Sequence, residues 1–112
     1  MTQLQLPMLT VYSGPRLLDH DTVAAARSYR DAVRLCWDCR TRKNLPKTLL
    51  ATEAGCYASH VTDYLSADEK RRDLPAKHIA GFEVSCGNRA ISQWLAAQAN
   101  LTILETFIAR AA

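Results

Sequence analysis

Residues 47–65 contain the pattern that most constrains the fold, because they predict two short helices joined by a tight turn. Such a pair needs a small residue where the helices touch, a glycine in the turn, and apolar residues that face the core. The residues that we assign to the turn and its packing are Ala51, Gly55, Cys56, Val61 and Tyr64. The spacing predicts the two helices over residues 45–54 and 58–66.

The composition of the 112-residue chain favours helices throughout. Seventeen Ala and fourteen Leu stand against five Val and four Ile, and Gly and Pro together number eight. Ala and Leu lose little side-chain freedom in a helix, whereas β-branched residues favour strands. No apolar run approaches the roughly 20 residues that cross a bilayer, and the N-terminus lacks a secretory signal pattern. We expect an all-α, compact bundle of about five helices, cytoplasmic and with no membrane partner.

Residues 1–20 show no sustained apolar period and contain two of the four prolines. They are expected to form a flexible N-terminal arm. The first helix is expected to begin at Asp21 or Thr22, either of which can cap its free amides, and to continue through Trp37. The solvated face of this helix is expected to carry Arg27, Arg30 and Arg34.

The helical domain is expected to occupy residues 21–100 and to end in two further helices. Asp73 is a candidate cap for the first of them, and Gly87 is placed to end it in the left-handed conformation. Asn88 is a candidate cap for the second. Residues 101–112 form an apolar-rich helical segment that either closes the core or contacts a second copy.

The second helix of the predicted pair presents a polar outward face. Its candidate base-reading residues are Tyr57, Ser59, His60, Thr62 and Asp63. In a helix–turn–helix, the N-terminal part of the second helix meets base edges in the major groove of DNA. Ser and Thr hydroxyls suit base or phosphate contacts, although this face lacks the Arg, Lys, Asn and Gln that usually read bases. For His60 the alternative is a half-buried hydrogen-bonding residue.

A cluster of four basic residues with no acidic neighbour directly precedes and begins the helix pair. The chain carries a net charge of only +3, so its total charge barely favours an anionic partner. The local concentration instead predicts contacts with the DNA backbone, whose strength falls steeply with salt. The candidate backbone contacts are Arg40, Arg42, Lys43 and Lys47.

The helix pair resembles the helix–turn–helix of lambda-repressor-like regulators at Ala51, Gly55, Cys56, Val61 and Tyr64. Residues 72–95, from Arg-Asp-Leu-Pro to Ile-Ser-Gln-Trp-Leu, are similar to small phage regulators of the CII type. The resemblance covers about residues 24–100. It implies a nucleoid-associated transcriptional regulator of a phage or prophage in a bacterial host. Such a protein binds double-stranded DNA as a homodimer and needs no cofactor or small-molecule substrate.

The four cysteines are Cys36, Cys39, Cys56 and Cys86. Without an export signal, disulfides are not expected, and the thiols are interpreted as small apolar side chains in a helical core. Cys36 and Cys39 form a CxxC pattern within a helix, which leaves a zinc site or a redox-responsive switch as alternatives.

Catalytic motifs are not evident in the sequence. It contains no glycine-rich phosphate loop, no GxSxG and no HExxH, and the three histidines lie far apart. We therefore expect a protein that is not an enzyme and has no catalytic or metal-ligating residues. The alternative function is a helical protein–protein adaptor that binds a host or phage factor without DNA, because the base-reading residues are few and the C-terminal segment is apolar.

Overall fold

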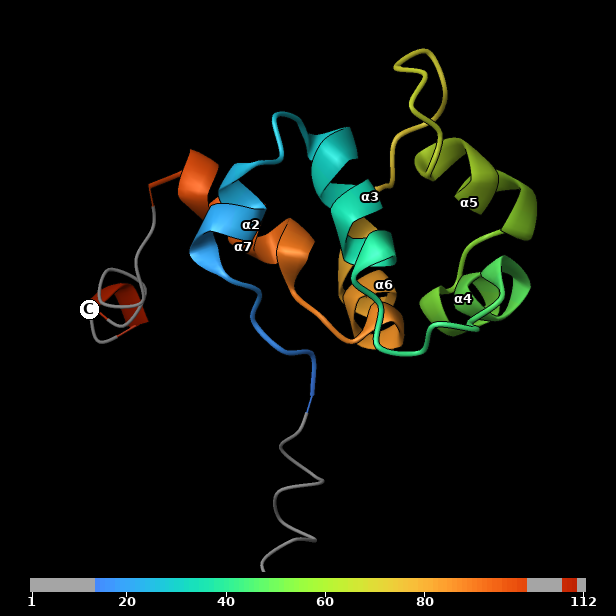
Figure 1. Cartoon of the computed structure of the whole chain (residues 1–112), viewed down its shortest axis with the longest axis horizontal. Coiled ribbons are helices and arrows are strands. Elements are labelled where there is room, and N and C mark those ends of the chain that lie inside the picture. The colour runs from blue at the N-terminus through green and yellow to red at the C-terminus, as the bar shows by residue number, and fades with distance from the viewer. Residues whose placement is uncertain (1–13, 101–107, 111–112) are drawn as a thin grey trace, which may run out of the picture.

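The computed structural model describes residues 14–100 and 108–110, and its described part is helical (Figure 1). The prediction of an all-α fold is confirmed, and no β-strand occurs among these residues. No helix in this part of the chain is long and apolar enough to span a membrane. The elements are α2 (His20–Ala24), α3 (Tyr29–Asp38), α4 (Lys47–Ala54), α5 (Ala58–Tyr64), the 3-10 helix η1 (Ala76–His78), α6 (Ile79–Cys86) and α7 (Ala90–Gln98).

Helix α3 lies at the centre of the bundle and packs against α5, α6 and α7. Figure 1 shows α2 and α7 on one side of α3 and the α4–α5 pair on the other. The core between them is formed by fully buried side chains from each of these helices except α2, including Val33, Leu50, Val61, Phe82 and Ile91. Burial of these apolar side chains is the main stabilising contribution to the fold.

The single helix that was predicted from residue 21 to 37 is instead divided into α2 and α3. Ser28 begins α3 as its N-cap, because its hydroxyl oxygen accepts a hydrogen bond from the Asp31 amide at 3.1 Å. The Asp31 carboxylate in turn accepts from the Arg27 amide at 3.2 Å. This reciprocal capping supplies partners for free amides and favours a new helix start over a continuous helix. Helix α2 is capped by Asp19 rather than by Asp21 or Thr22.

The described end of the expected N-terminal arm is fixed to the bundle rather than flexible. The Arg16 amide donates to the Gly87 carbonyl, and the Arg89 amide donates to the Arg16 carbonyl, both at 3.0 Å. Two residues later, the Gln93 side-chain amide bonds both the Leu18 N–H at 2.8 Å and the Leu18 carbonyl at 2.9 Å. The side chain of Leu18 is buried. Residues 1–13 of the arm and residues 101–107 of the C-terminal segment lie outside the described part, whereas residues 108–110 are helical.

The connection between α6 and α7 follows the predicted caps only in part. Gly87 ends α6 with φ 82°, as predicted. The N-cap of α7 is Arg89 rather than the predicted Asn88, although the Asn88 side chain still accepts from the Ala90 amide at 3.1 Å. Asp73, however, does not cap α6: its carboxylate pairs with Arg30 at 2.9 Å, and the 3-10 helix η1 leads into α6.

Gly87→Ala should destabilise the fold more than Gly55→Ala does. Both glycines have φ near 80°, so each substitution forces Ala into the left-handed region at a cost of about 1–2 kcal/mol. A Cβ at Gly87 would lie 2.5 Å from Oγ1 and 3.3 Å from Cβ of Thr41, whereas a Cβ at Gly55 meets nothing within 4 Å. Overpacking should therefore add about 1 kcal/mol or more to the loss at Gly87. Urea unfolding of the two variants measures this difference, and equal losses would contradict the close contact.

Candidate nucleic-acid interface

Helices α4 and α5 fall where the helix–turn–helix was predicted, separated by the three residues 55–57. Gly55 ends α4 with φ 79°, and the Cys56 amide donates back to the Ala51 carbonyl at 2.9 Å. Tyr57 has an extended backbone and precedes the first residue of α5. The left-handed glycine turns the chain sharply enough for α5 to pack against α4 immediately after the turn.

The inward faces of the pair are held by apolar contacts. Ala51 on α4 and both Val61 and Tyr64 on α5 are buried. Cys56 is half-buried in the turn, and this burial raises the pKa of its thiol. On the other side of α4, an added Cβ at Gly81 would lie 3.0 Å from the Ala54 Cα, so α6 approaches the α4 backbone closely. These contacts fix α4 against α6 and leave the outer face of α5 uncovered.

The exposed face of α5 carries three of the five predicted base-reading residues. Tyr57, directly before α5, is 73% exposed, and Ser59 and Thr62 are exposed on the first and second turns of the helix. His60 is half-buried: its ring packs edge-on against Tyr57 and Tyr64, with ring centroids 5.1 and 6.4 Å apart. The His60 position therefore matches the alternative of a half-buried, hydrogen-bonded residue.

Asp63 does not belong to the exposed face, which corrects the prediction. Its side chain is only 18% exposed. The carboxylate pairs with Arg71 at 3.2 Å and with Arg72 at 3.1 Å, and Arg72 also bonds Nε2 of His60. Each carboxylate oxygen is already paired with an arginine, and these ion pairs compete with any hydrogen bond from a base. The sequence interpretation missed this cluster because the two arginines follow α5 by a loop and match no helical spacing.

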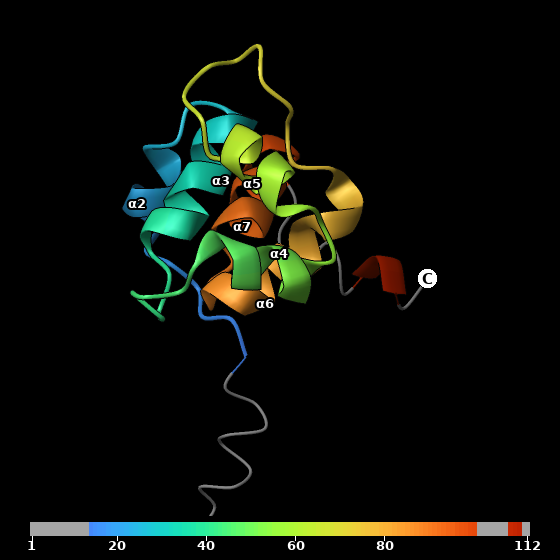
Figure 2. The ribbon, with the colours of Figure 1, turned by 90° about the vertical axis from the view of Figure 1, so that its right-hand side faces the viewer.

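The loop of residues 66–73 places Arg71 and Arg72 beside α5. Figure 2 shows α4 and α5 facing the viewer with this loop above them. Both arginine side chains remain more than half exposed despite their ion pairs. They add two guanidinium groups next to a helix that has no Lys or Arg of its own.

Arg30 holds this loop and is not on a solvated face, contrary to the prediction. Its side chain is 6% exposed, and its guanidinium reaches from α3 under the end of α5 and the start of the loop. Besides the Asp73 carboxylate, it donates at 2.6–3.0 Å to four main-chain carbonyls, those of Asp63, Ser66, Arg71 and Arg72. A planar guanidinium with five N–H groups suits such a set of acceptors. Arg30 therefore fixes the loop that carries the two arginines.

Two of the four predicted backbone-contact residues, Arg40 and Arg42, make intramolecular contacts. Arg40 lies over the Trp37 ring, 4.0 Å from its centroid, and donates to the Lys43 carbonyl at 2.9 Å. Arg42 forms a bidentate pair with Glu53 at 2.6 and 3.2 Å and donates to the Ser85 carbonyl. The guanidinium of Arg42 and the Ser85 hydroxyl together lower the pKa of Glu53 to about 2. These contacts shape the loop between α3 and α4; Arg40 is half-buried there, whereas Arg42 stays exposed beside its ion pair.

Lys43 and Lys47 are exposed, as is Arg42, but unlike Arg42 the two lysines do not project into an ion pair with Glu53. Lys47 is the first residue of α4, and Lys43 lies in the loop before it. Together with Ser59 and Thr62 of α5, they define what we call the α4–α5 surface. This surface combines hydroxyl groups along α5 with ammonium groups at and just before the start of α4.

The cysteines are free thiols, and Cys36 and Cys86 are buried. A hydrogen bond with Cys86, together with burial, raises the pKa of the Cys36 thiol far above its ordinary value. Within residues 14–100 and 108–110, no three His, Cys, Asp or Glu side chains gather as a metal site would require.

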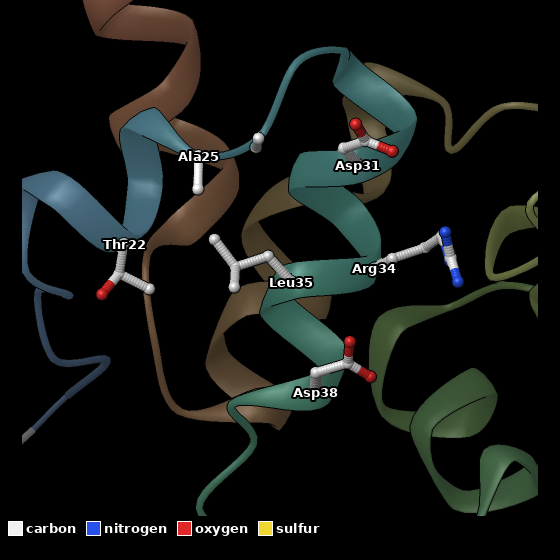
Figure 3. A pocket seen from close by; sticks show the side chains of 7 residues that line it. Thr22, Ala25, Asp31, Arg34, Leu35 and Asp38 are labelled. Atoms are coloured by element: carbon white, nitrogen blue, oxygen red, sulfur yellow. The ribbon is translucent and has the colours of Figure 1, made fainter.

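A shallow hollow of about 240 Å³ lies between α2 and α3 (Figure 3). Asp31 and Asp38 stand toward its two ends, and Leu35 lies between them facing α2. The hollow therefore has an apolar floor and acidic ends, and the side chains that line it include no nucleophile beside a general base, as many catalytic sites have.

Exposed residues of the predicted helix pair thus lie on the α4–α5 surface. In comparisons with known proteins, no protein-family model, no curated protein and no solved structure matches this chain.

Proposed function

We propose that the protein is a sequence-specific, non-enzymatic DNA-binding regulator of the phage or prophage type. The observation that carries the proposal is the α4–α5 pair, which buries Val61 and Tyr64 while it exposes Tyr57, Ser59 and Thr62. A short helix presented in this way after a tight turn suits insertion into the major groove of double-stranded DNA. No cofactor or small-molecule substrate is part of this proposal.

The exposed groups divide between bases and phosphates. Ser59 and Thr62 supply short hydroxyls for base edges, and the Tyr57 hydroxyl suits a phosphate or sugar. Lys43 and Lys47 attract the backbone on one side of α5, and the arginines at 71 and 72 attract it on the other. Because α5 offers no bidentate base reader, part of the specificity would come from sequence-dependent DNA shape. A homodimer would bind two half-sites related by symmetry.

Selection of binding sites from a random duplex library tests the proposal directly. Folded protein should enrich a defined motif, and fluorescence anisotropy should show tighter binding to that motif than to scrambled duplexes. Binding should weaken steeply as salt concentration rises. Absence of binding at low salt by protein with an intact helical circular dichroism spectrum would reject DNA binding.

Lys47→Ala should weaken binding to all duplexes by a similar factor. Loss of one phosphate contact reduces the slope of log K against log salt by about 0.9 and leaves the preferred motif unchanged. Arg27→Ala is the matched control, because Arg27 is exposed in the α2–α3 connection, away from the α4–α5 surface. Anisotropy titrations over a range of salt concentrations measure both slopes. A changed motif with an unchanged slope would contradict the assignment of Lys47 to the backbone.

A protein–protein adaptor is the second candidate function. The observation that favours it is the exposure of two large apolar side chains, Leu49 and Tyr57, on the same helix pair. Large exposed apolar side chains are typical of surfaces that bind protein partners. If the protein enriches no DNA motif, Tyr57→Ala should abolish binding to the partner protein while leaving the fold intact.

A further inference from the structure

An apolar groove of about 650 Å³ lies between α2 and α7, together with the segment that precedes α2. Its walls include Leu17 and Val23 on one side and Trp94 and Ala97 on the other. Leu17 is 68% exposed, the large apolar side chain of the groove most open to solvent. Figure 1 shows α2 and α7 at the side of α3 that is remote from α5. Exposed apolar surface of this kind favours a partner that buries it.

The chain leaves the bundle at one end of this groove. Helix α7 ends at Gln98, which lines the groove, and Asn100 has a left-handed backbone with φ 56° that redirects the chain. Twelve residues follow Asn100. Their apolar positions include Leu101, Leu104, Phe107 and Ile108, at the spacing of one helical stripe. A helix of this length would span about 18 Å.

We infer that the groove binds the segment 101–112 of a second copy of the chain, and that the two copies exchange these segments reciprocally. Ile108 belongs to the apolar stripe, yet it is 56% exposed in the single chain, so its own groove does not bury it. A symmetric dimer presents the same groove and the same segment twice, which satisfies both apolar surfaces at once. The groove and α5 lie on opposite sides of α3, so the dimer leaves the α4–α5 surface free.

Sedimentation of the full chain without DNA tests this inference independently of the proposed function. The wild-type protein should form a dimer. Leu17→Asp in the groove and Ile108→Asp in the segment should each raise the dimer dissociation constant at least about tenfold. Val84→Asp is the matched control, because the exposure of Val84 lies between those of Leu17 and Ile108 but Val84 is on α6 outside the groove, and it should leave the dimer unchanged. A monomeric wild type, or unchanged dimerisation of either groove or segment variant, would overturn the inference.

Crosslinking identifies whose segment occupies the groove. In a background in which Cys39 and Cys56 are replaced by serine, a Leu17→Cys chain is mixed with an Ile108→Cys chain and oxidised. Reciprocal exchange should give a disulfide-linked pair of the two different chains. A third chain carries both Leu17→Cys and Ile108→Cys. If only this chain forms a disulfide, and the disulfide lies within one chain, the segment binds its own groove and the inference fails. A negative result in either experiment would reject this mode of dimerisation only. DNA binding by the α4–α5 surface is tested separately, by selection from the duplex library.

Discussion

Arg30→Met should lower the free energy of unfolding by about 3 kcal/mol or more and should release the loop of residues 66–73 from the bundle. At 2.6–3.0 Å the guanidinium donates to four main-chain carbonyls and one carboxylate, and methionine replaces its stem without any donor. Hydrogen bonds from a charged group contribute about 1.5–3 kcal/mol each, but the carbonyls of a released loop regain water, which limits the net loss. Urea unfolding measures the stability, and hydrogen exchange measures the opening of the loop.

Two further variants show whether the planar geometry of the Arg30 guanidinium or only its charge is responsible for the stability. Arg30→Lys keeps the charge but offers a compact ammonium in place of a planar fork, so it should recover only part of the lost stability. Arg34→Met removes a half-buried arginine one turn further along α3 and should cost much less. Equal losses from Arg30→Met and Arg34→Met would contradict the role of Arg30. Because Arg71 and Arg72 lie on the released loop, DNA affinity should also fall in Arg30→Met even where the protein remains folded.

The parts of the structure that could be predicted from the sequence depend on local spacing. Gly55 and Gly87 each follow a stretch with helical apolar spacing, and glycine adopts the left-handed conformation that ends a helix without strain. Both positions could therefore be predicted as helix ends. Burial of Val61 and Tyr64 follows from helical periodicity in the same way. Glycine placement and apolar periodicity extend over fewer than ten residues, so they can be recognised without knowledge of the tertiary fold.

The errors concern charged residues whose partners are distant in the sequence. Arg30 finds its acceptors more than 30 residues away, and Arg42 finds Ser85 43 residues away. Helical spacing assigned Arg30 to the outside because no local pattern reveals a loop that folds over it. The same reason explains Asp63, whose outward position was inferred without the arginines that follow in the loop. For a candidate binding site, the sequence therefore predicted the scaffold better than it predicted which charges are free.

Ser59→Glu should reduce DNA affinity at least about 100-fold, or about 3 kcal/mol, while the protein remains fully folded. Ser59 is exposed in the first turn of α5, where a carboxylate interacts favourably with the free amides of the helix, so stability should not fall. In the proposed complex, however, this carboxylate would face the bases and phosphates of the major groove, and their negative charge would repel it. Fluorescence anisotropy with the selected duplex measures the loss.

The matched control for this variant is Thr22→Glu. Thr22 is an exposed residue of α2, which lies on the side of α3 remote from α5, and the substitution changes the net charge by the same amount. If the whole-protein charge governed binding, both variants would weaken it equally. A loss confined to Ser59→Glu would instead assign the effect to the α4–α5 surface. Retention of wild-type affinity by Ser59→Glu would mean that α5 does not enter the groove, and the adaptor function would then be the better explanation of the exposed Tyr57 and Leu49.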